Sequence, residues 1–185
     1  MSDTNPSRIV DLLEAGAVGA VVNGRAEVGP RALGHRSIIA IPGSVAVKDQ
    51  INGVKSRETW RPFGGVTLEK HRDLYWCADR ELSRYMIGAG TVTPCGRRDA
   101  PAVVHVDGTT RPQWVESGTA PVTESLLEEL EKRGMPPVLL NTSFNGRDQP
   151  IVQSSAEALA TSDALRLDFL IIDDLGYRPR PSVGS

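Results

Sequence analysis

The chain has 185 residues, 39% of them hydrophobic and 24% charged, which predicts a single soluble globular domain large enough to bury a core. Its formal net charge of −2 at pH 7 argues against binding a long nucleic acid along one face. The two cysteines, Cys77 and Cys95, lack the spacing of a zinc site, and the first ten residues lack the pattern of a secretion signal. No apolar run approaches the ~20 residues that span a bilayer, so we expect a cytoplasmic protein without membrane association.

The first half of the chain predicts two strands and two helices. Residues 1–7 are expected to be disordered, and "SRIVDLLEAG" predicts a short helix that Ser7 caps and Gly16 ends. The apolar runs "VGAVVN" and "SIIAI" predict buried strands, and "SVAVKDQINGVK" after them is a weaker helix candidate. Residues 60–96 are rich in turn formers and aromatics and carry no clear assignment.

The second half alternates strands and helices more regularly. Strands are predicted at "PAVVHVDG", which ends in an Asp-Gly turn signal, at "PPVLLNTSFNG" and at "DFLIIDD". Helices are predicted at "TAPVTESLLEELEKRG" and at "SSAEALATSDALRL", where Ser154 and Glu157 stand in capping-box register. This alternation predicts an α/β fold with a mixed sheet over residues 8–175, followed by a flexible tail at 176–185.

The loop "GRAEVGPRALGHRS", Gly24–Ser37, carries three arginines among three glycines and a proline. Glycines let the backbone approach a ligand closely, and a guanidinium offers a planar fork that matches phosphate or carboxylate. Arg31 and Arg36 lie close enough in sequence for one loop to present both to a single anion. Surface ion pairs are the alternative, and this loop alone leaves both interpretations open.

A second basic cluster follows in "VKSRETWRPFGG". Lys55, Arg57 and Arg61 lie close together, and Trp60 and Phe63 could form one wall of a pocket. A run of this kind is usually a solvated face. Two separate basic loops in a net-acidic chain nevertheless favour one shared site for a small polyanion.

Two further segments bring polar residues to strand ends. In "HVDGTTRPQ" a predicted strand delivers Arg111 at a turn, and in "LLNTSFNGRDQPIV" a buried strand ends at Asn141 and Ser143. Ligands of open α/β sheets bind at the carboxyl ends of strands, where amides and hydroxyls suit a purine edge, a ribose or phosphate oxygens. For Thr142 and Asn145, hydrogen bonding to the loop backbone is a competing interpretation.

These four segments, in this order and with roughly this spacing, resemble the C-terminal domain of the carbamoyltransferase family, which includes the nodulation and cephamycin carbamoyltransferases. The resemblance runs from about Ile9 to Asp174. It implies a YrdC-like fold, a twisted mixed sheet flanked by helices. It also implies that carbamoyl phosphate and ATP with Mg²⁺ give carbamoyl-adenylate, phosphate and pyrophosphate.

The same resemblance implies a division of labour between two domains. In the family a separate domain of the sugar-kinase and actin type transfers the carbamoyl group to an acceptor hydroxyl and carries an iron site. This chain has no paired-histidine metal motif, since His71 and His105 stand apart, so no protein-ligated metal is expected here. We therefore expect a separate sugar-kinase-fold transferase as partner, with natural-product biosynthesis as the setting.

The family resemblance also assigns roles to individual residues. Catalytic roles fall on Lys55, Arg61 and Arg111, and substrate-binding roles fall on Arg31, Arg36, Asn141 and Ser143. Lys55 and Arg61 are expected on carbamoyl phosphate. The other five are expected around the shared phosphate or carbamate region, where several fixed cations would offset the repulsion between two phosphorylated substrates.

The chain departs from the family pattern at three places, of which His35 and Ile41 could reshape the nucleotide side. His35 replaces a usual asparagine, either as a neutral hydrogen-bonding group or as a titrating one. "IPG" at Ile41–Gly43 replaces a usual Asp-Pro-Arg, and Asp148 with Gln149 replaces a usual Gly-Glu. None of these departures removes a residue assigned to the site.

Two alternative functions compete with carbamoyl-adenylate formation. The chain could be a non-catalytic partner subunit that binds a nucleotide or an anion, or an ATP-dependent enzyme that adenylates another small carboxylate. RNA binding, known for this fold, is disfavoured by the acidic balance. Trp60, Tyr75 and Trp76 are candidates for a contact with the transferase, with burial in the core as the alternative.

Overall fold

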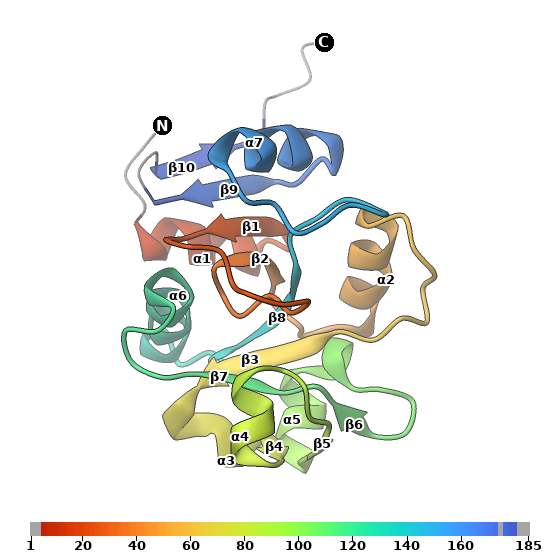
Figure 1. The fold of residues 1–185 in the computed structure, drawn as a ribbon. Helices are drawn as coiled ribbons and strands as arrows, with labels where there is room; N and C mark the ends of the chain where they lie inside the picture. The colour runs from red at the N-terminus through yellow and green to blue at the C-terminus, as the bar shows by residue number, and fades with distance from the viewer. Residues whose placement is uncertain (1–4, 174–175, 181–185) are drawn as a thin grey trace.

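The computed structural model describes residues 5–173 and 176–180, and a mixed seven-stranded sheet forms its centre. Figure 1 shows this sheet, whose strands follow the order β10-β9-β1-β2-β8-β3-β7. Its strands are β1 (Gly19–Val22), β2 (Arg36–Ala40), β3 (Gly64–Leu68), β7 (Gln113–Val115), β8 (Val138–Ser143), β9 (Phe169–Ile172) and β10 (Gly176–Pro179). β1 pairs with β9 and β3 with β7 in parallel, and the remaining pairs are antiparallel.

Helices cover both faces of this sheet. Those of eight or more residues are α1 (Pro6–Glu14), α2 (Val45–Val54), α6 (Pro121–Lys132) and α7 (Ser155–Ala164). α1 and α6 pack together on one face, where Leu13, Leu127 and Ile39 belong to one buried apolar cluster. α2 and α7 contribute to the cluster on the other face, because side chains alternate along each strand: in β1, Val21 faces the first cluster and Ala20 the second.

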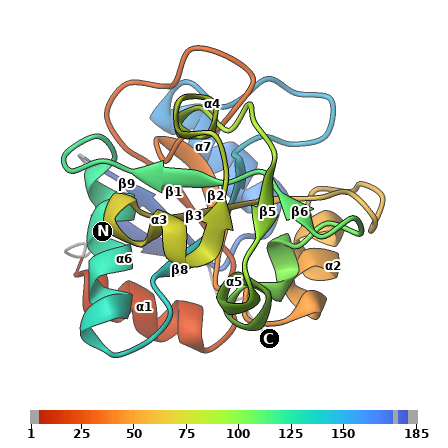
Figure 2. The same ribbon diagram turned by 90° about the horizontal axis from the view of Figure 1, so that it is seen from below.

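The segment 60–96, without a clear assignment from sequence, contains β3 of the central sheet, and from residue 69 on the chain builds a small second layer next to β3 and β7 (Figure 2). Its elements are short: a 3₁₀ turn (Glu69–His71), α3 (Arg72–Tyr75), β4 (Trp76–Cys77), α4 (Arg80–Arg84), β5 (Gly90–Val92) and α5 (Pro94–Asp99). β5 joins β4 to β6 (Thr109–Thr110) in a three-stranded antiparallel sheet. Tyr75 and Trp76 lie in the core with 1% and 2% of their surfaces exposed, so of the two interpretations given for them, burial in the core is confirmed.

The α/β class and the main elements are confirmed, with three local corrections. Asn5, not Ser7, caps α1, since its side chain accepts a hydrogen bond from the Ser7 backbone N–H and Pro6 occupies the first turn. The predicted strand at 101–108 is a 3₁₀ turn (Pro101–Val103), because Ala102 and Val103 are both buried in the core around it.

The third correction concerns the chain ends. Residues 176–179, predicted as a tail, form the edge strand β10 beside β9. The predicted disorder at 1–7 is wrong for residues 5–7, because Asn5 caps α1 and Pro6 and Ser7 begin it. Residues 1–4 and the predicted tail at 181–185 lie outside the described residues. Within the described ranges, no helix is long and apolar enough to cross a membrane.

Candidate functional site

Four segments that are far apart in sequence meet at the end of β8 and form a small polar pocket. Its volume is about 100 Å³. It is lined by Pro30, Arg31, Ala32, Arg57, Pro62, Phe63, Gly64, Met86, Arg111, Asn141, Thr142 and Ser143. The arginine loop, the segment after α2, the turn before β7 and the end of β8 thus converge, as the sequence predicts. We call this pocket the arginine pocket.

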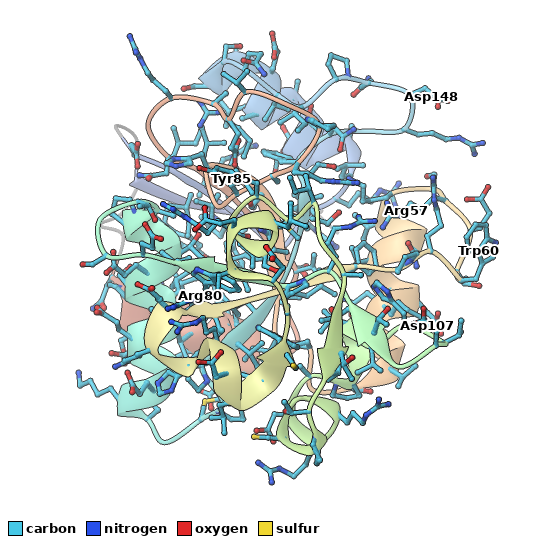
Figure 3. The ribbon with its side chains drawn as sticks, turned by 60° about the horizontal axis from the view of Figure 1, so that its bottom comes forward. Arg57, Trp60, Arg80, Tyr85, Asp107 and Asp148 are labelled. Carbon is cyan, nitrogen blue, oxygen red and sulfur yellow. The ribbon has the colours of Figure 1, made fainter. Side chains whose placement is uncertain are left out.

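A second pocket adjoins it. Its volume is about 190 Å³, and it shares Arg57 and Ser143 with the arginine pocket. Its other lining residues are Lys55, Glu58, Arg61, Asn145, Gly146, Arg147 and Asp148. Figure 3 shows Arg57 and Asp148 on the same side of the molecule, on the loops after α2 and β8. Because the two pockets share residues, we treat them as one cleft, and we call the second one the lysine pocket.

The inner cations of this cleft lie without carboxylate partners, and the carboxylates that line it are exposed. Among the described residues, no salt bridge involves Arg31, Arg57 or Arg111. Arg61 pairs with Glu58 at 3.8 Å, and Arg147 pairs with Asp148 at 3.6 Å. Burial, together with the charge of Arg31, lowers the pKa of Arg111. Burial, with the charge of Arg61, lowers the pKa of Arg57 to about 10. Clustered cations that depress one another's pKa are stabilised when an anion binds between them.

Lys55 is the most deeply embedded of these cations, with 6% of its surface exposed. Its Nζ donates to the Ser143 carbonyl oxygen at 2.6 Å and to Asn145 Oδ1 at 2.8 Å. Burial first, and then the charge of Arg57, lower its pKa to about 7. Lys55 therefore holds the end of β8 in place and titrates close to neutral pH.

Within the arginine loop, the structure separates Arg31 from Arg36. Arg36 is 5% exposed and lines neither pocket. Its guanidinium donates to four backbone carbonyl oxygens, those of Asn23, Gly24, His35 and Gln153, at 2.9–3.3 Å. The expectation that Arg36 faces the substrates is therefore corrected: its donors are used in closing the loop.

Glu27 shapes the same loop from the inside. Its Oε1 accepts hydrogen bonds from the backbone N–H groups of Leu33, His35 and Arg36 at 2.6–3.1 Å. His35 Nδ1 lies 2.9 Å from the Asn23 carbonyl oxygen and so donates to it. With its backbone fixed in this way, the loop presents Arg31 to the cleft.

Asn141 is held by an unusual set of contacts. Its Nδ2 donates to Gln113 Oε1 at 2.6 Å and to the Ala32 carbonyl oxygen at 3.0 Å, and Gln113 Nε2 donates to the Leu33 carbonyl oxygen at 2.9 Å. Asn141 is 1% exposed, and its Oδ1 has no hydrogen-bond partner in the part of the chain that the structure describes. A buried acceptor left without a donor is costly, so a ligand that supplies one is favoured there.

The site therefore contains six of the seven residues assigned from sequence, and their chemical roles stay predictions. Sequence reasoning assigned no role to Arg57, although it lines both pockets, or to Gln113. Arg57 stands two residues after Lys55, as Asn145 stands two after Ser143, and this matched spacing is the signal that could have identified it. For Gln113, no sequence signal distinguishes it from other strand residues.

The remaining sequence candidates lie outside the cleft or have other partners. Trp60 is 70% exposed, and Figure 3 shows it at the periphery of the molecule. His71 bonds to Glu131, and His105 bonds to Thr109 and the Phe63 carbonyl oxygen. No group of three or more metal-ligating side chains occurs within residues 5–173 and 176–180.

Comparison with known proteins identifies the family. The family described as Carbamoyltransferase C-terminus matches residues 10–178. Nodulation protein NolO of Bradyrhizobium diazoefficiens is 40% identical over 185 residues, which cover 98% of this chain and 34% of that protein. Nodulation protein NolNO of Sinorhizobium fredii is 39% identical over 173 residues, with 92% and 25% covered. The chain thus spans about a third or less of the length of these relatives.

Solved structures support the fold. A crystal structure of full-length HypF in a phosphate- and nucleotide-bound form matches with a TM-score of 0.65 and 16% identity, over 93% of this chain and 21% of that one. HypF of T. kodakarensis matches with a TM-score of 0.63 and 13% identity. The match along nearly its whole length places this chain in the family of the carbamoyltransferase C-terminal domain.

Proposed function

We propose that this chain forms carbamoyl-adenylate from carbamoyl phosphate and ATP. The observation that carries the proposal is the cleft in which Arg31, Arg57, Arg61, Lys55 and Arg111 gather without a buried carboxylate partner. Such a cleft suits two phosphorylated substrates bound together, because fixed cations offset the repulsion between them. Membership of the carbamoyltransferase family supports the carbamoyl group as the group that is transferred.

The proposed reaction has two steps, hydrolysis of carbamoyl phosphate and adenylation of the carbamate. Water cleaves carbamoyl phosphate into carbamate and inorganic phosphate. A carbamate oxygen then attacks the α-phosphorus of ATP, forming a C–O–P linkage, while the bond to the β-phosphate breaks and pyrophosphate leaves. Mg²⁺ enters with ATP and neutralises charge on the leaving pyrophosphate.

The residues of the cleft divide between these steps. Lys55 and Arg61 line the larger lysine pocket, where they would bind the phosphoryl group of carbamoyl phosphate. Arg31 and Arg111 line the smaller arginine pocket with Asn141 and would hold the carbamate. Arg57 lines both pockets and would stabilise charge that develops on phosphorus as the two groups meet.

Carbamoyl transfer to an acceptor hydroxyl would then take place elsewhere. Carbamoyl-adenylate is a labile mixed anhydride, so a partner of the sugar-kinase type would protect it from water. The relatives that share this domain are three to four times as long as the matched segment, which leaves room in those proteins for such a domain.

Pyrophosphate release tests the proposal. We expect release that depends on ATP, Mg²⁺ and carbamoyl phosphate together, with AMP accumulating as the adenylate hydrolyses. Arg111→Met should abolish this release while Lys132→Met, at the exposed end of α6 and outside both pockets, retains most of it. Nucleotide binding without any release would favour the non-catalytic partner subunit. Release with another small carboxylate but not with carbamoyl phosphate would favour the alternative adenylating enzyme.

A further inference from the structure

Two amide side chains meet beneath the arginine pocket although their strands are not neighbours. Asn141 lies on β8 and Gln113 on β7, and β3 runs between them. The β3 residue opposite Asn141 is Gly64, which has no side chain to separate the two amides. A Cβ there would meet the Met86 side chain and the Arg111 carbonyl oxygen within 2.6 Å, so the space is closed to other residues.

Backbone carbonyl oxygens fix the direction of both amides. The Leu33 carbonyl oxygen can only accept, so the Gln113 amide must present Nε2 to it and Oε1 to Asn141. Asn141 must then present Nδ2 to Gln113, and the Ala32 carbonyl oxygen accepts from the same Nδ2. Asn141 Oδ1, the atom left over, has no partner among the described residues.

We propose that Gln113 is a positioning residue that holds Asn141 Oδ1 as an acceptor in the arginine pocket, and that this acceptor selects acyl phosphates whose acyl group carries an N–H. Carbamoyl phosphate has such a group at the carbon that reacts. Acetyl phosphate, of nearly the same shape, has a methyl group there and would leave the buried oxygen unpaired. Sites built to hydrogen-bond a substrate N–H reject analogues that lack it.

This inference rests on the proposed function, and it adds to it the selection of the acyl group. A glutamine that lacks direct contact with the substrate acts only through Asn141. Its loss removes the shorter of the two hydrogen bonds that hold Asn141 Nδ2 and leaves only the one to the Ala32 carbonyl oxygen, so the amide can tilt about that contact. A displaced Oδ1 no longer meets the carbamoyl N–H, and the advantage of carbamoyl phosphate is lost.

The test compares carbamoyl phosphate with acetyl phosphate. The measured quantity is the ratio of their kcat/KM values for ATP-dependent pyrophosphate release. Gln113→Met keeps the size of the side chain and removes both hydrogen bonds. We expect it to lower the ratio by about 10- to 100-fold, the range that one unpaired buried polar group costs. Gln50→Met, on the exposed surface of α2, should leave the ratio unchanged. Partial unfolding lowers both rates equally and does not change a ratio.

A double-mutant cycle separates positioning from general damage to the site. Asn141→Leu removes the acceptor and should lower the ratio to the same level as Gln113→Met. Adding Gln113→Met to Asn141→Leu should then lower it no further, because the glutamine acts through the asparagine. Equal loss of both acyl phosphates in Gln113→Met, or a further fall of the ratio in the double variant, would overturn the inference.

Calorimetric titration of the two acyl phosphates without ATP distinguishes failure of the inference about Gln113 from failure of the proposed function. Preferential binding of carbamoyl phosphate that disappears in Gln113→Met, with no pyrophosphate release from any variant, would leave the inference standing and remove the proposed function. Pyrophosphate release from the wild-type chain with equal use of both acyl phosphates would support the proposed function and overturn the inference about Gln113. A bound water that satisfies Asn141 Oδ1 equally with either ligand would give this same result.

Discussion

Binding of carbamoyl phosphate should weaken steeply between pH 7 and pH 9 because of Lys55. The pKa of this buried ammonium is lowered to about 7. Below that pH, Lys55 already carries its charge when the ligand arrives. Above it, the free protein holds a neutral amine, and binding next to a phosphate dianion must first restore the proton. Affinity therefore falls as the pH rises through the pKa of the free state.

The magnitude follows from the pKa alone when the bound lysine stays charged over this range. The dissociation constant rises about tenfold per pH unit above 7, which gives roughly 50-fold between pH 7 and pH 9. The arginines contribute little to this slope: Arg57 has a pKa of about 10, and the guanidinium of Arg111 keeps its charge as arginine does in proteins. The phosphate itself is a dianion over most of this range.

Isothermal titration with carbamoyl phosphate at pH 7, 8 and 9 measures the effect. Lys55→Met should bind weakly at pH 7 and show a nearly flat profile, so that its difference from the wild type narrows toward pH 9. Lys132→Met, at the exposed end of α6, is the matched control and should keep the wild-type slope. Parallel curves for the wild type and Lys55→Met would show that another group titrates, and the reasoning about Lys55 would be refuted.

Three further outcomes are expected from stability measurements by urea unfolding. Arg36→Met should lower the free energy of unfolding by at least about 2 kcal/mol, since it strands buried carbonyl oxygens, whereas Arg31→Met should change it little and weaken anion binding instead. Gly64→Ala should destabilise through its contacts with Met86 and Arg111, whereas Gly53→Ala, with open space on α2, should stabilise by about 0.4–1 kcal/mol. Because the unfolded chain holds the Lys55 proton up to its ordinary pKa near 10.5, the free energy of unfolding should rise from pH 7 to pH 10 more steeply in the wild type than in Lys55→Met.

The sequence predicts best the elements that hydrophobic pattern and length define together. The apolar runs that become β1, β2, β8 and β9 and the leucine stripe of α6 all lie where expected. The layer at 69–99 defeats such reasoning because its strands have two or three residues and its helices four to six, too few for a periodic pattern. The run at 101–108 shows the same limit, because a short apolar segment can be buried without being a strand.

The site was predictable as a set of loops but not as a set of side-chain directions. Arg31 and Arg36 are the same residue type in the same loop, and only the fold decides between them. Gln153, 117 residues further along the chain, supplies one of the carbonyl oxygens that hold Arg36. Arg31 has no such acceptor within residues 5–173 and 176–180, and it lines the cleft instead. Local sequence contains neither fact, since both depend on which backbone atoms arrive from elsewhere.

The arrangement also explains how a net-acidic chain can hold six cations in one cleft. Burial first, and then the charge of a neighbouring cation, raise the cost of charging these groups, as the lowered pKa values of Lys55, Arg57 and Arg111 reflect. Hydrogen bonds to neutral oxygens, such as those from Lys55 to Ser143 and Asn145, keep the cleft formed without neutralising it. A carboxylate partner would stabilise the empty site better, but it would compete with an anionic substrate. The absence of such a partner around Arg31, Arg57 and Arg111 among the described residues is therefore what a site for phosphorylated ligands requires, and a site built only for stability would not tolerate it.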